Sequence, residues 1–241
     1  MNIRLRIFLC FLLATLPAAL LQAATEEGGA SLFDLLRQGG WAMYPLGALS
    51  LAMFYLLFHC FQQTQTKRFF DPADLSSARE ALAKRDVAGA QSVFEKGSTA
   101  LSRLMRISLG KARVDETDAR RAAMEQAYAE AAEGEENDVG QWINYLNVVA
   151  TVAPMVGLLG TVSGMIGAFQ KIGQAGMGRP EELAGNIGEA LITTATGLVI
   201  GIPAMIAYFI YRNRLNARML KTHQAAGELF DALCDSPPAK K

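Results

Sequence analysis

The sequence predicts an all-α integral membrane protein with three transmembrane helices and a helical cytoplasmic domain. Of its 241 residues, 51% are hydrophobic and only 19% are charged, which is too apolar for an ordinary soluble domain. After residue 37, three long runs contain no Asp, Glu, Lys or Arg, at residues 38–66, 139–170 and 190–211. Each run supplies the roughly 20 apolar residues that a helix needs to cross a hydrocarbon core about 30 Å thick. Three such runs in one chain disfavour the alternative of buried helices in a soluble core.

Residues 1–23 are predicted to be a secretory signal peptide. Arg4 and Arg6 precede an apolar run, which Pro17 ends and small residues follow. This order of basic, apolar and small-residue regions is typical of a cleaved signal. An uncleaved signal anchor is the alternative, which the shortness of the apolar run disfavours. Cleavage leaves residues 24–40 as a periplasmic N-terminal segment.

Positive charges beside the apolar runs predict the orientation of the chain. Lys67 and Arg68 directly follow the first run. Arg212 and Arg214 directly follow the third run. By the positive-inside rule both positions are cytoplasmic, so the mature N-terminus is expected in the periplasm and the C-terminus in the cytoplasm.

The segment boundaries follow from the runs, their flanking charges and the turn residues. Trp41 and Tyr44 mark the outer end of the first span, because amphipathic rings favour the membrane interface. The predicted segments are transmembrane helix 1 (41–61), a cytoplasmic helical domain (62–141), transmembrane helix 2 (142–170), a periplasmic loop and helix start (171–188), transmembrane helix 3 (189–211), and a cytoplasmic C-terminal helix and tail (212–241).

Turn residues predict where helices begin and end outside the apolar runs. The cytoplasmic domain is rich in Ala, Glu, Arg and Lys and has no proline after Pro72, which favours helices. Gly97 and Gly110 are expected to interrupt them. Pro180 is expected in the first turn of a helix, where its missing N–H costs nothing.

Small residues follow one face of each of the last two spans, at steps of three and four residues. In lipid such faces let helix backbones approach closely, so they predict helix packing. Any tightly packed protein with three spans can show these stripes, so the pattern alone identifies no function. The predicted packing positions are Gly157, Gly160, Gly164, Gly197 and Gly201.

Two prolines and three polar side chains lie within or beside these spans. Pro154 and Pro203 each remove a backbone hydrogen bond and are predicted helix kinks, either static or hinge-like. The hydroxyls of Thr161 and Thr194 either hydrogen-bond to backbone carbonyls of their own helices or line a water-filled path through the membrane. Glu189, at the outer end of the third span, is either a functional group at membrane depth or an ordinary interfacial carboxylate.

The sequence lacks the motifs of several functional classes of protein. The sequence holds neither a phosphate-binding GxxxxGK[ST] loop nor a GxSxG nucleophile elbow, so we expect no enzyme. The cysteine and histidine spacings match no metal site or cofactor motif. The formal net charge of zero gives no electrostatic basis for nucleic-acid binding. The three apolar runs also contain no aspartate that could carry a proton.

Three stretches resemble the ExbB/TolQ/MotA proton-channel family. Residues 152–166, VAPMVGLLGTVSGMI, resemble its second-span signature, and residues 189–204, EALITTATGLVIGIPA, resemble its third-span signature. Residues 39–46, GGWAMYPL, are similar to the start of the first span in ExbB-like members that carry a signal peptide. One departure is the end of the first span, where residues 59–63 read HCFQQ and ExbB-like members often have a Glu-Arg pair.

The resemblance implies roles for individual residues. Thr161 and Thr194 match the pore threonines of the family, and Glu189 matches the glutamate five positions before the second threonine. Pro154 and Pro203 resemble prolines of MotA-type members. The family forms pentameric rings around two single-span partner chains of the ExbD/TolR/MotB type, and the partner supplies the aspartate that takes the proton.

The resemblance also implies a function. We expect a multi-pass protein of the bacterial inner membrane that serves as the proton-channel subunit of a motor. This motor would use the protonmotive force to drive a partner acting in the cell envelope, for example a TonB-like protein in TonB-dependent transport. Sodium in place of protons stays open at this point. The alternative function is a non-conducting membrane scaffold that holds partner transmembrane helices.

Overall fold

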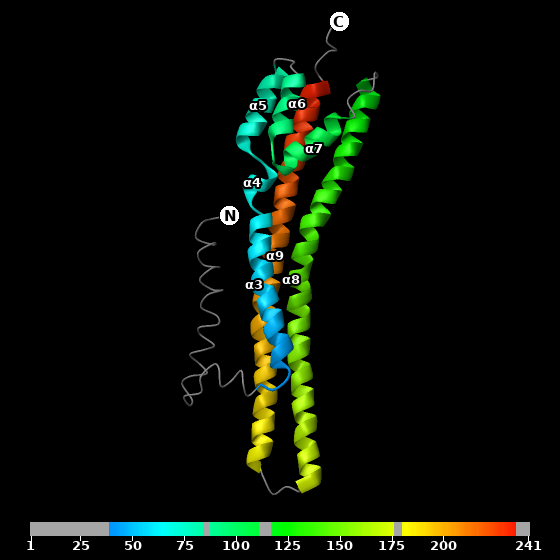
Figure 1. The fold of residues 1–241 in the computed structure, drawn as a ribbon. Coiled ribbons are helices and arrows are strands. Elements are labelled where there is room, and N and C mark those ends of the chain that lie inside the picture. The colour runs from blue at the N-terminus through cyan, green and yellow to red at the C-terminus, as the bar shows by residue number, and fades with distance from the viewer. Residues whose placement is uncertain (1–38, 84–86, 111–116, 176–179, 235–241) are drawn as a thin grey trace. The chain divides into compact units, whose positions relative to one another are not determined.

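The computed structural model describes residues 39–83, 87–110, 117–175 and 180–234, and Figure 1 shows their helices. The predicted signal peptide and almost all of the N-terminal segment lie outside these residues. Every regular element in the described part is an α-helix. The helices are α3 (Met43–Gln63), α4 (Thr66–Phe69), α5 (Pro72–Ala83), α6 (Val87–Lys96), α7 (Ala100–Leu109), α8 (Thr117–Ala175) and α9 (Pro180–Cys234).

Three of these helices are long and apolar enough to cross a membrane. They are α3 itself, the part of α8 within Arg121–Gly173 and the part of α9 within Ala184–Ala232. This finding confirms the predicted all-α fold with three candidate transmembrane helices. Pro180 is the first residue of α9, and Gly97 and Gly110 directly follow α6 and α7, as the turn residues predict.

The described chain divides into two compact units. The first unit contains residues 39–57 and Tyr145–Tyr208, and the second contains Phe58–Asn144 and residues 209–234. Helices α3, α8 and α9 each contribute residues to both units. The first unit contains the apolar signatures of the last two spans, and the second contains the short helices α4 to α7.

In the first unit α8 and α9 pack against each other in antiparallel directions. Successive contacts pair Gly164 with Ala190, Gly157 with Thr193, and Gly197 with Ala153, so one residue number falls as the other rises. A Cβ atom built on Gly197 would lie only 2.6 Å from the carbonyl oxygen of Ala153. Glycine is therefore needed for the backbones to approach this closely, as in other membrane helix pairs.

Both prolines lie inside uninterrupted helices. Helix α8 continues through Pro154, and α9 continues through Pro203. The ring of Pro154 faces Gly201, where an added Cβ would lie 2.7 Å from the ring carbon Cγ. The missing side chain at Gly201 thus provides the space that the proline ring fills between the two helices.

In the second unit the short helices enclose an apolar core. Phe69, Phe94, Leu101 and Met105 are at most 1% exposed. Helix α7 begins at a capping residue, Thr99, whose side chain accepts a hydrogen bond from the backbone N–H of Ser102. The cap satisfies one of the free N–H groups at the helix start.

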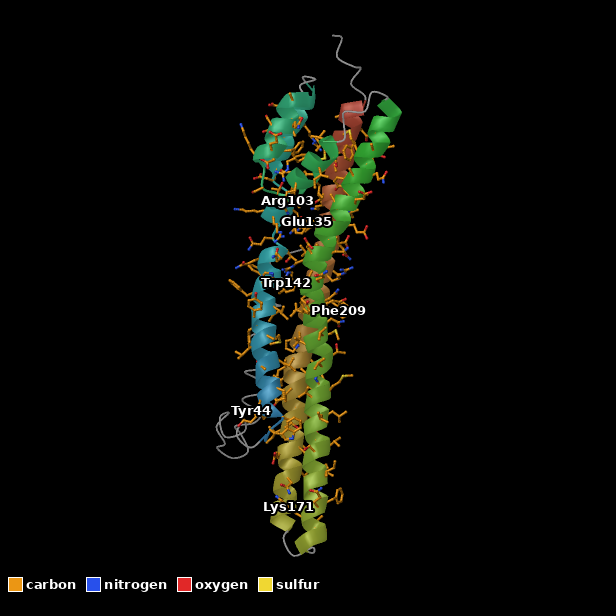
Figure 2. The ribbon with its side chains drawn as sticks, turned by 45° about the vertical axis from the view of Figure 1, so that its right-hand side comes forward. Tyr44, Arg103, Glu135, Trp142, Lys171 and Phe209 are labelled. Atoms are coloured by element: carbon orange, nitrogen blue, oxygen red, sulfur yellow. The ribbon has the colours of Figure 1, made fainter. Side chains whose placement is uncertain are left out.

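One carboxylate joins three helices of the second unit. Glu135 of α8 accepts a hydrogen bond from Arg103 of α7, with 2.6 Å between Nη2 and Oε1. Arg68 of α4 lies 3.6 Å from the same oxygen. Figure 2 shows Arg103 and Glu135 side by side. Because the Glu135 side chain is only 14% exposed, this ion pair is better shielded from solvent than a surface pair.

Candidate functional site

The two threonines predicted as site residues meet between α8 and α9. The hydroxyl of Thr161, on α8, is hydrogen-bonded to the hydroxyl of Thr194, on α9. The Oγ1 atom of Thr161 also lies 3.0 Å from the carbonyl oxygen of Ala190 and 3.2 Å from that of Gly157. The structure therefore brings together two hydroxyls that are 33 residues apart in the sequence.

A third threonine, which the sequence analysis does not single out as a site residue, belongs to the same network. Thr193 is 2% exposed, and its Oγ1 atom lies 2.7 Å from the carbonyl oxygen of Ala190. The same Oγ1 atom lies 3.2 Å from the carbonyl oxygen of Gly157. Thr194 Oγ1 lies 3.2 Å from that carbonyl as well. The available signal was the position of Thr193 on the small-residue face, one turn before Gly197.

Glycine at position 157 makes this network possible. A Cβ atom there would lie 2.8 Å from the carbonyl oxygen of Thr193 and 3.1 Å from the Cα atom of Thr194. A larger residue would push α9 away and take the threonine hydroxyls out of reach of the Gly157 carbonyl. The predicted packing positions and the predicted hydroxyl positions thus form one structural feature.

The three hydroxyl groups have more acceptor atoms within reach than they have protons to donate. Each hydroxyl donates one hydrogen bond at a time, and its hydrogen rotates to suit its neighbours. Thr161 has the choice of the Gly157 carbonyl, the Ala190 carbonyl and the Thr194 hydroxyl. Several donor arrangements are therefore open without movement of any heavier atom. Such a network can hydrogen-bond an added carboxylate or water molecule, and it carries no buried charge of its own.

Glu189, the third predicted site residue, lines a pocket beside this network. The pocket has a volume of about 170 Å³ and includes Thr193 in its wall. It lies among the start of the first predicted span, α8 and α9. We call it the Glu189 pocket, and its lining residues are Gly39, Trp41, Ala42, Gly160, Ser163, Gly164, Gly167, Lys171, Asn186, Glu189 and Thr193.

Two long-range hydrogen bonds hold the wall of the Glu189 pocket. The indole Nε1 of Trp41 donates to the hydroxyl of Ser163 at 3.2 Å. The ammonium group of Lys171 donates to the side-chain oxygen of Asn186 at 3.2 Å. In Figure 2 Lys171 lies towards the end of α8 that leads to α9. These four polar side chains were not among the predicted site residues, because their partners are distant in sequence or on another helix.

The end of the first span differs from the family pattern, and the structure gives it an aromatic contact. The ring of His59 lies against that of Trp142 in the second unit, with 4.3 Å between centroids and 52° between ring planes. The Nε2 atom of His59 lies 3.2 Å from the amide nitrogen of Gln63. Since an amide nitrogen only donates, this bond requires the His59 nitrogen to accept.

These features together define a class of protein. The described residues contain three candidate transmembrane helices, two of which share a polar hydroxyl network inside charge-free runs. No group of three or more His, Cys, Asp or Glu residues in the described part is placed to hold a metal ion. The described residues thus have the helices expected of a multi-pass membrane protein, and their candidate site contains hydroxyl, carbonyl and carboxylate groups.

Comparison with known proteins identifies the family. Residues 90–224 match the model of the MotA/TolQ/ExbB proton channel family. The chain is 30% identical over 199 residues to biopolymer transport protein ExbB of Xanthomonas campestris, covering 78% of this chain and 79% of that protein. It is 34% identical over 171 residues to Tol-Pal system protein TolQ of Haemophilus influenzae, covering 70% and 71%. The chain therefore belongs to the MotA/TolQ/ExbB proton channel family.

A shorter match has a higher sequence identity. Biopolymer transport protein ExbB of Neisseria gonorrhoeae is 48% identical over 60 residues, which cover 25% of this chain and 27% of that protein. The family match includes Thr161, Glu189 and Thr194. Together with the three apolar helices, family membership supports an inner-membrane protein of the proton-channel motor class.

Proposed function

We propose that this chain is the channel-forming subunit of an inner-membrane motor that uses the protonmotive force to drive a partner protein acting in the cell envelope. The hydroxyl pair of Thr161 and Thr194 is the observation that carries the proposal, because it brings two polar groups together between two apolar helices of this family member. One elementary charge that crosses 100 mV releases about 2.3 kcal/mol. A few protons therefore provide enough free energy to rearrange a protein interface.

The proposal includes partner chains and a ring of copies. The apolar runs of this chain contain no aspartate, so a single-span partner of the ExbD/TolR type would bring the carboxylate that takes the proton. The hydroxyls of Thr161 and Thr194 would hydrogen-bond that carboxylate or a water molecule entering with the proton. Met155 and Leu158 of α8 are 65% and 59% exposed, which leaves apolar surface for lipid or for neighbouring copies in a pentamer. In an ExbB-like system the driven envelope protein would be of the TonB type.

Proton uptake by reconstituted vesicles tests the proposal. The chain and its ExbD/TolR-like partner are co-purified and placed in liposomes that contain a pH-sensitive dye, and a potassium diffusion potential is applied. We expect uptake only when both chains are present, and none when the membrane aspartate of the partner is replaced by asparagine. Equal leak in all samples would favour the non-conducting scaffold. Uptake of sodium in place of protons would show that sodium is the coupling ion.

The orientation of the chain is also part of the proposal. The charges at Lys67, Arg68, Arg212 and Arg214 favour a cytoplasmic location for the segment between the first two spans. Ser92 in α6 and Gly173 near the end of α8 are both exposed and serve as reporter positions.

Cysteine labelling of intact spheroplasts checks this orientation, in a variant whose native cysteines are replaced. A reagent that does not cross membranes is expected to label Gly173→Cys at least ten times faster than Ser92→Cys. Permeabilised membranes are the control, and there both cysteines should react. Labelling of Ser92→Cys alone in intact spheroplasts would show that the chain has the opposite orientation.

A further inference from the structure

We propose that the Glu189 pocket holds a short chain of water molecules and is the entrance by which protons reach the threonine network within each subunit. The inference rests on the proposed function for the direction of proton movement. It adds a water-binding site, built by this chain alone, between the outer end of the spans and the pair of Thr161 and Thr194.

The size and lining of the pocket suit water. Its volume is about 170 Å³, and a water molecule occupies about 30 Å³ in the liquid, so several waters fit. A hydrated site also needs polar partners, usually two to four for each water. The hydroxyls of Ser163 and Thr193 and the carboxylate of Glu189 are among those that the wall provides.

Asn186 gives an independent reason to place water in the pocket. Its side-chain oxygen accepts a hydrogen bond from Lys171 at 3.2 Å. Because an ammonium group only donates, the orientation of the amide is fixed with its nitrogen turned away from Lys171. That nitrogen is buried and has no protein acceptor among the described residues. Buried polar groups are nearly always hydrogen-bonded, and a water in the adjoining pocket is a suitable acceptor.

The outer wall of the pocket is formed by the residues that precede α3. Gly40 has a φ angle of +59°, a conformation that favours glycine, and an added Cβ there would overlap the carboxylate oxygen Oε1 of Glu189. The next residue, Trp41, is 53% exposed and donates its indole hydrogen to Ser163. Glycine at position 40 thus lets the backbone pass beside Glu189 while Trp41 anchors this wall to α8.

The inner end of the pocket is one hydroxyl away from the threonine pair. Thr193 lines the pocket, and its Oγ1 atom shares the Ala190 carbonyl with Thr161 at distances of 2.7 and 3.0 Å. A hydronium ion in the pocket can give its proton to the Glu189 carboxylate and remain as water. The protonated carboxyl can return a proton to another water, and a threonine hydroxyl passes a proton on by accepting one and donating another.

Filling the pocket tests the inference. Gly167 lines the pocket, and an added Cβ there meets nothing within 4 Å, so Gly167→Leu should fold and occupy the water space. Gly173 lies on the same helix, has equally open surroundings and is not a lining residue, so Gly173→Leu is the matched control. We expect at least a tenfold loss of partner-dependent proton uptake for Gly167→Leu and less than a twofold change for Gly173→Leu. Both variants should retain the parent subunit count.

A second measurement detects the water without any motor activity. Ser163→Cys is introduced into a variant whose native cysteines are replaced, and the chain is purified without its partner. A small cationic thiosulfonate should modify this cysteine, and adding Gly167→Leu should slow the reaction at least tenfold. Gly173→Leu should leave the rate unchanged. An unreactive Ser163→Cys would overturn the hydrated pocket.

The two readouts separate this inference from the proposed function. Normal proton uptake by Gly167→Leu, together with lost uptake by the threonine variants, would overturn the pocket as an entrance and leave the proposed function standing. If the parent chain and its partner take up no protons, the proposed function fails and the entrance fails with it. A reactive Ser163→Cys that Gly167→Leu protects would then still support the water-binding site.

Discussion

Replacing Thr161 and Thr194 together by valine is expected to reduce partner-dependent proton uptake by at least tenfold. Valine keeps the branched shape of threonine and removes the hydroxyl, so the site loses its capacity to bond a carboxylate or water. In the structure the two hydroxyls bond to each other and reach the carbonyls of Gly157 and Ala190. Thr193 still reaches both carbonyls in the double variant. We therefore expect a modest loss of stability, about 0.5–1.5 kcal/mol for each hydrogen bond removed.

Thr196→Val is the matched control for this experiment. Thr196 lies on the same helix, but its hydroxyl donates to the carbonyl oxygen of Ile192 in its own helix at 2.8 Å. The control loses one hydrogen bond from a side chain to the backbone of its own helix, and it should keep proton uptake within about twofold of the parent. Normal uptake by the double variant would eliminate the threonine mechanism and favour the scaffold.

The effect of Glu189→Gln distinguishes the two interpretations of that residue. The amide keeps the size of the carboxyl group and cannot exchange a proton. A loss as large as that of the threonine double variant is expected if Glu189 lies on the path, and a smaller loss if it is only an interfacial carboxylate. Its place in the same pocket as Thr193 favours the larger effect.

The sequence was sufficient to predict which residues of α8 and α9 share a face. Steps of three and four residues fix the angle around a helix, and this placed Thr161 with the glycines of the second span. The same periodicity placed Thr194 near the small-residue face of the third span. In lipid only small residues allow close backbone approach, so both faces were expected to lie at helix–helix contacts. The hydrogen bond between Thr161 and Thr194 agrees with that reasoning.

The Glu189 pocket could not be predicted in the same way. The bond between Trp41 and Ser163 joins residues 122 positions apart, and it depends on how the start of the first span is rotated against α8. Helical periodicity gives the faces of one helix and does not give the rotation of a neighbour. Asn186 and Lys171 also lie outside the apolar signatures, where no pattern marks them as partners.

Composition likewise marks the edge of an apolar run and not the end of a helix. The charge-free run of the second span begins near residue 139, whereas α8 begins at Thr117. The backbone hydrogen bonds of a helix do not depend on whether its side chains face lipid or water, so α8 continues through the change. The long charged part of α8 therefore belongs to the second unit, where Glu135 bonds Arg103.

The substitution with the largest expected structural effect is Gly197→Leu. Its Cβ would lie 2.6 Å from the carbonyl oxygen of Ala153 and 3.2 Å from the Cα atoms of Pro154 and Gly157. All three neighbours are backbone atoms, so no side-chain rotation can relieve the overlap. At Gly160 the nearest atoms belong instead to side chains, the hydroxyl of Thr193 at 2.6 Å and the Cβ atoms of Ala42 and Thr193 at 2.9 Å, so Gly160→Leu should first displace side chains and not backbone. We expect Gly197→Leu to cost more than the about 1–3 kcal/mol typical of overpacking.

Thermal unfolding and the subunit count of the purified protein measure this effect. Gly188→Leu is the control on the same helix, because an added Cβ at Gly188 meets nothing within 4 Å. Gly197→Leu should unfold at a lower temperature than Gly188→Leu, and it should not give the parent subunit count, because separating α8 from α9 would change the surface available to the proposed oligomer. It should also abolish proton uptake, since the hydroxyl of Thr194 would no longer reach Thr161. Equal melting temperatures and subunit counts for the two leucine variants would show that close backbone approach is not what holds these helices together.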